Sequence, residues 1–195
     1  MNILFDTLPT TIQIEEKEVP IKTDFRCWLR FAGIVQKYDL DNITVGEFVE
    51  MMEKIISTVF KDPEDIEINV SLFSNLLNFY VGFYERKNKK EKEEQEKSFD
   101  FEIDADAIYA SFVKEYGIRL KDTEMHWYEF RTLFGHLSDD TPIGKLIQIR
   151  MMKEEDVPKD KLTEFRKLKE EIALPSFGSY AEDENVKKKL REKLK

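Results

Sequence analysis

The chain has 195 residues, of which 41% are apolar and 36% charged, and its formal net charge is −9. This length suits one domain, or one domain with a smaller lobe, and the apolar share is too large for a disordered chain. The acidic balance argues against general binding to phosphate backbones, so no nucleic-acid partner is expected. The single Cys27 cannot form an internal disulfide, which favours a reducing compartment.

The sequence also argues against secretion and membrane insertion. Its first residues, MNILFDTLPTT, lack the basic region and the long apolar run of a signal peptide. No apolar stretch reaches the roughly 18–20 residues that are needed to cross a bilayer. We therefore expect no membrane partner.

The N-terminal part, residues 1–85, is predicted to hold a short β-hairpin followed by helices. Residues 11–22 alternate at period two around a charged turn, which is typical of a hairpin, and Pro20 indicates an edge position. Helical periodicity follows, with Trp28 in the middle of a helix that is apolar around most of its girth. The predicted helices cover residues 24–38, 44–60 and 71–86.

A charged segment, RKNKKEKEEQEKS at residues 86–98, contains no apolar residue. It is either a solvated helical extension or a flexible linker, and we interpret it as the main boundary in the chain. The C-terminal part, residues 99–175, is predicted to be helical and to pack on the first part. The expected fold is therefore mainly α: a single-domain multi-helix bundle with a short N-terminal β-hairpin.

Local end signals place the helices of this C-terminal part. Asp104 is a predicted N-cap, and Gly117 fits the left-handed residue that ends the same helix. Thr141 is the predicted cap of a later helix, with Pro142 at its first position. The last predicted helix covers residues 158–174, and its apolar line consists of Leu162, Phe165, Leu168 and Ile172.

The densest aromatic stretch is DTEMHWYEFRTLF, residues 122–134, which also contains His126-x-x-Glu129. As a helix, it places Trp127 and Phe130 on one apolar arc and Tyr128 on another side, so neighbours are expected to grip it on two sides. His126 lies at the margin of the arc, and we interpret it as a structural residue. A metal site needs more ligands, and His136 is about 15 Å further along a continuous helix.

No catalytic, cofactor-binding or metal-binding residues are predicted. The chain lacks Cys-x-x-Cys, His-Glu-x-x-His, Gly-x-Ser-x-Gly and the glycine-rich phosphate loops. Cys27 is a lone thiol in the most apolar helix, where it is expected to be inert. The sequence therefore favours a protein that is not an enzyme and uses no cofactor.

The last segment, residues 176–195, is a polar tail that is predicted to contain a short amphipathic helix. Its apolar line is narrow, and a helix this short is marginal alone in water, so something must cover it. The parent domain, a sister subunit in a homo-oligomer and a client protein are the alternatives. The predicted partner-binding residues are Phe177, Tyr180, Val186, Leu190 and Leu194.

Several blocks together resemble one family of small phage proteins. TDFRCWLRF, FDFEIDADAIYASFVKEYGIRL, MHWYEFRTLFGHL, DTPIGKLIQIRMM and FRKLKEEIALP occur in this order. They resemble the bacteriophage gene-product-fifteen family of long-tailed phages and prophages of Gram-positive bacteria. The resemblance spans roughly residues 1–175, and it is most specific over Asp104–Tyr116 and Trp127–Leu137.

This resemblance implies a place in tail morphogenesis. Such proteins resemble tail-assembly chaperones, which implies binding to apolar helical segments of the tape-measure protein, or to another tail-assembly protein, in the host cytoplasm. The alternative is a structural component of the phage tail or of the head–tail joint. The resemblance carries over no catalytic residue.

Overall fold

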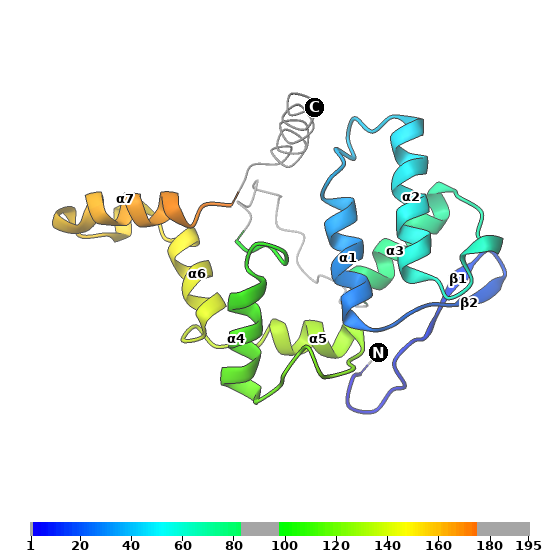
Figure 1. Ribbon diagram of the computed structural model, residues 1–195, viewed down its shortest axis with the longest axis horizontal. Helices are drawn as coiled ribbons and strands as arrows, with labels where there is room; N and C mark the ends of the chain where they lie inside the picture. Colours follow the sequence, from blue (N-terminus) through cyan, green and yellow to red (C-terminus); the bar gives the residue numbers. More distant parts are fainter. Residues whose placement is uncertain (1, 83–97, 175–195) are drawn as a thin grey trace, which may run out of the picture. The chain divides into compact units, whose positions relative to one another are not determined.

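The computed structural model describes residues 2–82 and 98–174 of the chain. These residues form a mainly helical fold with seven α-helices and one two-stranded hairpin, which confirms the predicted fold class (Figure 1). They divide into two compact units. The first consists of residues 2–82 and Met125–Thr132, and the second of residues 98–124 and 133–174.

The predicted hairpin is present at the start of the first unit. Strand β1 (Thr11–Ile14) pairs antiparallel with β2 (Lys17–Pro20). The amide of Ile21 donates to the carbonyl of Thr10, so Thr11 and Pro20 face each other as a pair without mutual hydrogen bonds. Pro20 therefore removes no donor from the ladder, which explains how a proline fits here.

Three helices complete the sequential part of the first unit, each at a predicted position. They are α1 (Phe25–Val35), α2 (Val45–Val59) and α3 (Val70–Val81), with the short 3₁₀ helix η1 (Pro63–Asp65) between the last two. Each begins at a side-chain cap, because the preceding Asp24, Thr44 and Asn69 accept amide hydrogens of the first turn. Thr44 forms a full capping box with Glu47.

The core of the first unit is aromatic and aliphatic. Helix α1 packs on α2, and α3 packs against β1. Trp28 is fully buried, as predicted, and its indole N–H donates to the carbonyl of Lys22 at 2.9 Å. The other large side chains of this unit that are fully enclosed are Ile21, Phe31, Met51, Met52, Ile55, Phe60, Leu72, Leu76, Trp127 and Phe130.

Helix α5 (Trp127–Phe134) starts in the first unit, although it follows the second unit's first helix in the chain. The residues just before α5 pair with those just before α1. The amide of Phe25 donates to the carbonyl of Met125, and the amide of Trp127 donates to the carbonyl of Thr23. Asp24 and His126 are the paired residues of this antiparallel bridge. Two helices far apart in sequence thus begin side by side.

The second unit contains α4 (Ala105–Tyr116), α6 (Pro142–Met151) and α7 (Leu162–Glu171), with the 3₁₀ helices η2 (Glu154–Asp156) and η3 (Lys159–Lys161) before α7. Helix α4 packs on α6. Gly117 adopts the predicted left-handed conformation with φ 67°. Thr141 caps α6 and Pro142 opens it, as predicted.

The prediction that Asp104 caps α4 is correct in position and wrong in chemistry. Asp104 precedes the helix, but its carboxylate makes no capping hydrogen bond. Instead, both of its oxygens accept from the guanidinium of Arg150, at 2.6 and 2.8 Å, and both residues are buried. Arg150 also donates to the carbonyls of Ser98 and Ile172. This network fastens the start of α4 to the end of α6.

Helix α7 is shorter than predicted and only partly covered. It occupies ten residues of the predicted 158–174, and of its apolar line only Phe165 is buried, while Leu168 is 40% exposed. Most of the predicted linker, 86–98, lies outside the described residues, so the predicted domain boundaries remain a prediction. Within residues 2–82 and 98–174, no helix has the length and apolar character to span a bilayer.

Candidate functional site

The predicted partner-binding residues Phe177, Tyr180, Val186, Leu190 and Leu194 lie outside the described residues. The described part of the chain has no group of three or more His, Cys, Asp or Glu side chains that could hold a metal ion. Cys27 is half-buried, and burial raises the pKa of its thiol. A raised pKa keeps the thiol protonated and weakens it as a nucleophile.

His126 is the cap of helix α5. Its Nδ1 accepts the amide hydrogen of Tyr128 at 3.0 Å, and the carboxylate of Glu129 accepts the amide hydrogen of His126 at 3.0 Å. This resembles the reciprocal pattern of a capping box, except that an imidazole replaces the usual hydroxyl and accepts from the second helical amide instead of the third. The His126-x-x-Glu129 motif is therefore explained by helix initiation.

The second ring nitrogen of His126 also has a backbone partner. Nε2 lies 3.0 Å from the carbonyl oxygen of Pro9, which can only accept a hydrogen bond. Since Nδ1 accepts from Tyr128, the ring must carry its proton on Nε2, and this assigns the neutral tautomer. With both nitrogens engaged, His126 ties the segment before β1 to the start of α5.

The first turns of α5 are gripped on two sides, as predicted. The ring of Trp127 stacks on Tyr80 with centroids 5.0 Å apart, and its indole N–H donates to the carbonyl of Tyr80. On the other side, Tyr128 stacks on Phe79 at 4.9 Å. Consecutive residues of α5 thus hold consecutive residues at the end of α3.

The end of α3 is closed by Arg131. Its guanidinium donates to the carbonyls of Tyr80 and Val81. These are among the last carbonyls of the helix, so no amide of the same helix is available to donate to them. Gly82 follows with φ 72°, and a Cβ at this position would lie 2.7 Å from Nη1 of Arg131. The positive φ therefore favours glycine here, whereas the flexible end of the Arg131 side chain could move away from an added Cβ.

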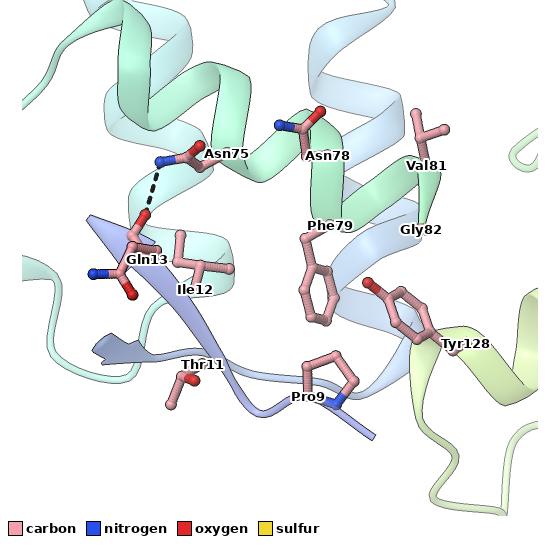
Figure 2. A pocket seen from close by; sticks show the side chains of 10 residues that line it. All are labelled: Pro9, Thr11, Ile12, Gln13, Asn75, Asn78, Phe79, Val81, Gly82 and Tyr128. Carbon is pink, nitrogen blue, oxygen red and sulfur yellow. Dashed lines mark hydrogen bonds between the residues drawn. The ribbon is translucent and has the colours of Figure 1, made fainter. Parts of the chain in front are cut away.

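A pocket of about 550 Å³ lies between β1, the end of α3 and the first turn of α5 (Figure 2). In Figure 2, α3 runs along one side of the pocket and β1 crosses below it, while the ring of Tyr128 stands beside that of Phe79. The described lining is uncharged throughout. It consists of Pro9, Thr11, Ile12, Gln13, Asn75, Asn78, Phe79, Val81, Gly82 and Tyr128.

The hydroxyl of Tyr128 is the one buried side-chain oxygen or nitrogen without a hydrogen-bond partner in the described part of the chain. The residue is only 5% exposed. Burial raises its pKa to about 12, so the hydroxyl remains protonated and able to donate at neutral pH. An unpaired buried polar group costs free energy, and a ligand that supplies an acceptor would recover it.

Sequence reasoning missed this pocket, although it separated Tyr128 from the Trp127 arc. Periodicity places Tyr128 on its own side of α5, but it cannot show that this side meets β1 and α3. The partners come from residues 9–13 and 75–82, more than 40 positions away. Long-range contacts bring them together: the bridge between the entries to α1 and α5, the contact of His126 with Pro9 and the stacking of Tyr128 on Phe79.

A second candidate surface lies on α4, in the second unit. Ile108 and Phe112 face the core, whereas Tyr109 and Val113, one turn apart, are 36% and 38% exposed. Ala105 and Ala110 are exposed on the same helix. The predicted apolar residues of α4 are therefore split between the core and an apolar stripe that stays partly exposed.

Comparison with known proteins gave one family. Its model, described as bacteriophage Gp15 protein, matches residues 4–174 and so spans both units of the fold. No curated protein and no solved structure gave a significant match. The match covers well over half of the chain, in agreement with the resemblance seen in the sequence. The chain therefore belongs to the bacteriophage Gp15 protein family, a family of phage structural or assembly proteins.

Proposed function

We propose that this protein acts without catalysis in phage tail assembly, as a chaperone that binds apolar helical segments of the tape-measure protein. A tape measure is a very long helical chain, and its apolar stripes need cover until tail-tube subunits polymerise around it. Binding takes place in the host cytoplasm and must be reversible. The physical task is to hold one amphipathic helix against another.

The observation that carries this proposal is the uncovered stripe on α4. Ala105, Tyr109 and Val113 recur every fourth residue, so they form a line along one side of the helix. A helix that is apolar on two sides is normally buried on both. Here the side of Ile108 and Phe112 is buried, whereas more than a third of the Tyr109 and Val113 surface is exposed. The stripe suits an amphipathic helix from a partner, and its small size suits reversible binding.

The test is co-expression with the tape-measure protein that the phage encodes, followed by co-purification. The variant Tyr109→Asn/Val113→Thr removes the apolar stripe from an exposed position, so it is expected to fold normally and to lose most of the tape-measure protein. Val45→Thr is the matched control, because Val45 is 83% exposed on α2 in the first unit. Equal recovery with both variants would assign binding to another surface.

The alternative function is that of a structural component of the tail or head–tail joint. A chaperone leaves before the particle is complete, whereas a structural component stays. Mass spectrometry of purified virions distinguishes the two. Stoichiometric recovery of this chain from mature particles would replace the chaperone with the structural role.

A further inference from the structure

We propose that the pocket between β1 and α3 is a second binding site, which takes an extended, uncharged peptide segment of a partner as a third strand beside β1. This site differs from the α4 stripe in its place and in the form of its ligand. All of its lining residues belong to the first unit. The choice of probe below rests on the proposed function.

The outer edge of β1 carries backbone groups that do not pair with β2. Because Thr10 and Ile21 are a hydrogen-bonded pair, the amides and carbonyls of Thr11 and Gln13 point away from β2. One of these four groups is occupied: the carbonyl of Gln13 accepts from the side chain of Asn75 at 2.7 Å (Figure 2). An amide of α3 thus already binds this edge as a neighbouring strand would.

The two strands of the hairpin differ in how well their sequences protect their outer edges. The sequence of β2, KEVP, carries two charges and a proline, which are the devices that protect sheet edges from foreign strands. The sequence of β1, TIQI, carries none of them. Of the two edges, β1 is therefore the one suited to strand addition, in which main-chain hydrogen bonds supply affinity and pockets receive alternate side chains.

The lining of the pocket indicates the chemistry of its occupant. The pocket offers amide side chains from Asn75 and Asn78, the apolar surfaces of Pro9 and Phe79, and the unpartnered hydroxyl of Tyr128. No charged residue belongs to the described lining, and the guanidinium of Arg131 beside it already donates to the carbonyls of Tyr80 and Val81, so an uncharged occupant is favoured. A peptide backbone supplies neutral acceptors and donors together, and one of its carbonyls would accept from Tyr128.

The size of the pocket limits what can occupy it. A volume of about 550 Å³ falls within the range of roughly 300–1,000 Å³ for ligand sites. It admits a few residues of an extended chain. It does not admit the edge of a second copy of this hairpin, which would bring its own α3 with it. A short linear segment is thus the occupant that fits.

The probe is a set of overlapping 12-residue peptides, acetylated and amidated, that covers the tape-measure protein. Their binding to the full-length protein is measured by fluorescence anisotropy. Tyr128→Phe removes only the hydroxyl, and it is expected to weaken binding by about 2- to 10-fold, as for one neutral hydrogen bond, without lowering the melting temperature. Thr11→Pro removes an outward amide and is expected to weaken binding more strongly.

Ser74→Ala is the matched control, since Ser74 is exposed on α3 and does not line the pocket. The inference is overturned if no peptide binds, or if Tyr128→Phe binds as the wild type does. Should Thr11→Pro not fold, Tyr128→Phe decides alone. Co-purification of the intact tape-measure protein tests the proposed function separately. If every pocket variant still recovers the tape-measure protein, the proposed function stands without this site. If peptides bind but the tape-measure protein is not recovered, the site stands without the proposed function.

Discussion

At the scale of single residues, two neighbours on α5 show how differently polar groups are used. Both ring nitrogens of His126 have backbone partners, one on α5 and one before β1. The hydroxyl of Tyr128, two positions further, has none among the described residues. The residue that sequence reasoning singled out is thus fully committed to structure, and the one with unused bonding capacity is the tyrosine.

If His126 caps α5, an acceptor of similar reach should replace it. His126→Ala removes the bond to the amide of Tyr128 and is expected to lower the free energy of unfolding by about 1 kcal/mol, as for other N-caps. His126→Asn keeps an acceptor near the helix start and is expected to restore most of this loss. Urea unfolding of both variants measures the difference. Equal losses would show that the ring acts through packing and not as a cap.

Tyr128 predicts a dependence of stability on alkaline pH. Its pKa is about 12 in the folded protein, against about 10 for an unfolded tyrosine. The folded state therefore holds this proton more tightly than the unfolded state does. The stability that depends on the protonated hydroxyl is fully present below pH 10 and is lost as the pH rises towards 12. By pH 11 the wild type is expected to have lost about 1 kcal/mol more than Tyr128→Phe.

Urea unfolding of both proteins at pH 8 and pH 11 checks this prediction. The phenylalanine variant retains every other alkaline group, including Tyr80, whose pKa burial also raises. Subtracting the two pH dependences thus isolates the hydroxyl of Tyr128. Parallel losses in the two proteins would mean that this hydroxyl titrates in the folded state as it does in water.

At the scale of elements, the sequence predicts what depends on neighbouring residues. Thr141 and Pro142 start α6, and Gly117 ends α4, because caps and left-handed residues act within one turn. The partners of Asp104 could not be predicted in this way. A carboxylate before a helix has the same local pattern whether it caps that helix or binds an arginine 46 positions away, as Asp104 does.

The ion pair of Asp104 and Arg150 is expected to behave as a unit. Asp104→Asn leaves the guanidinium buried without a counter-charge, which costs about 3–5 kcal/mol. The double variant Asp104→Leu/Arg150→Met removes both charges and is expected to lose less than Asp104→Asn alone. Urea unfolding of the single and double variants provides the measurement. A double variant that loses the sum of the single effects would show that the two side chains contribute independently.

The pocket marks the limit of sequence reasoning about elements. Each of its walls was predicted as a hairpin or a helix, and the grip on α5 from two sides was predicted as well. Their meeting depends on long-range contacts, such as the pairing of Asp24 with His126 and the contact of His126 with Pro9, for which a single sequence holds no periodic signal. Local pattern therefore yields the walls, and the long-range bridge between helix entries yields the site.

At the scale of the whole molecule, the chain combines two compact units with a tail, residues 176–195, outside the described residues. The family model ends at residue 174, where this tail is about to begin. In the tail sequence, Val186, Leu190 and Leu194 recur every fourth residue, a pattern that predicts an apolar line too narrow for a deeply buried helix. We propose that this line helps to bind the helix of a partner, with Phe177 and Tyr180 as the anchors nearest the domain in sequence.

Deletion of residues 176–195 tests this proposal with two measurements on one variant. If the tail binds a partner, the melting temperature is expected to stay unchanged while the tape-measure protein is lost from co-purification. A second variant, Val186→Ser/Leu190→Ser/Leu194→Ser, removes the apolar line and keeps the lysines, so it separates apolar contact from charge attraction. If the deletion lowers the melting temperature and leaves binding intact, the tail belongs to the fold, and the parent domain is what covers its apolar line.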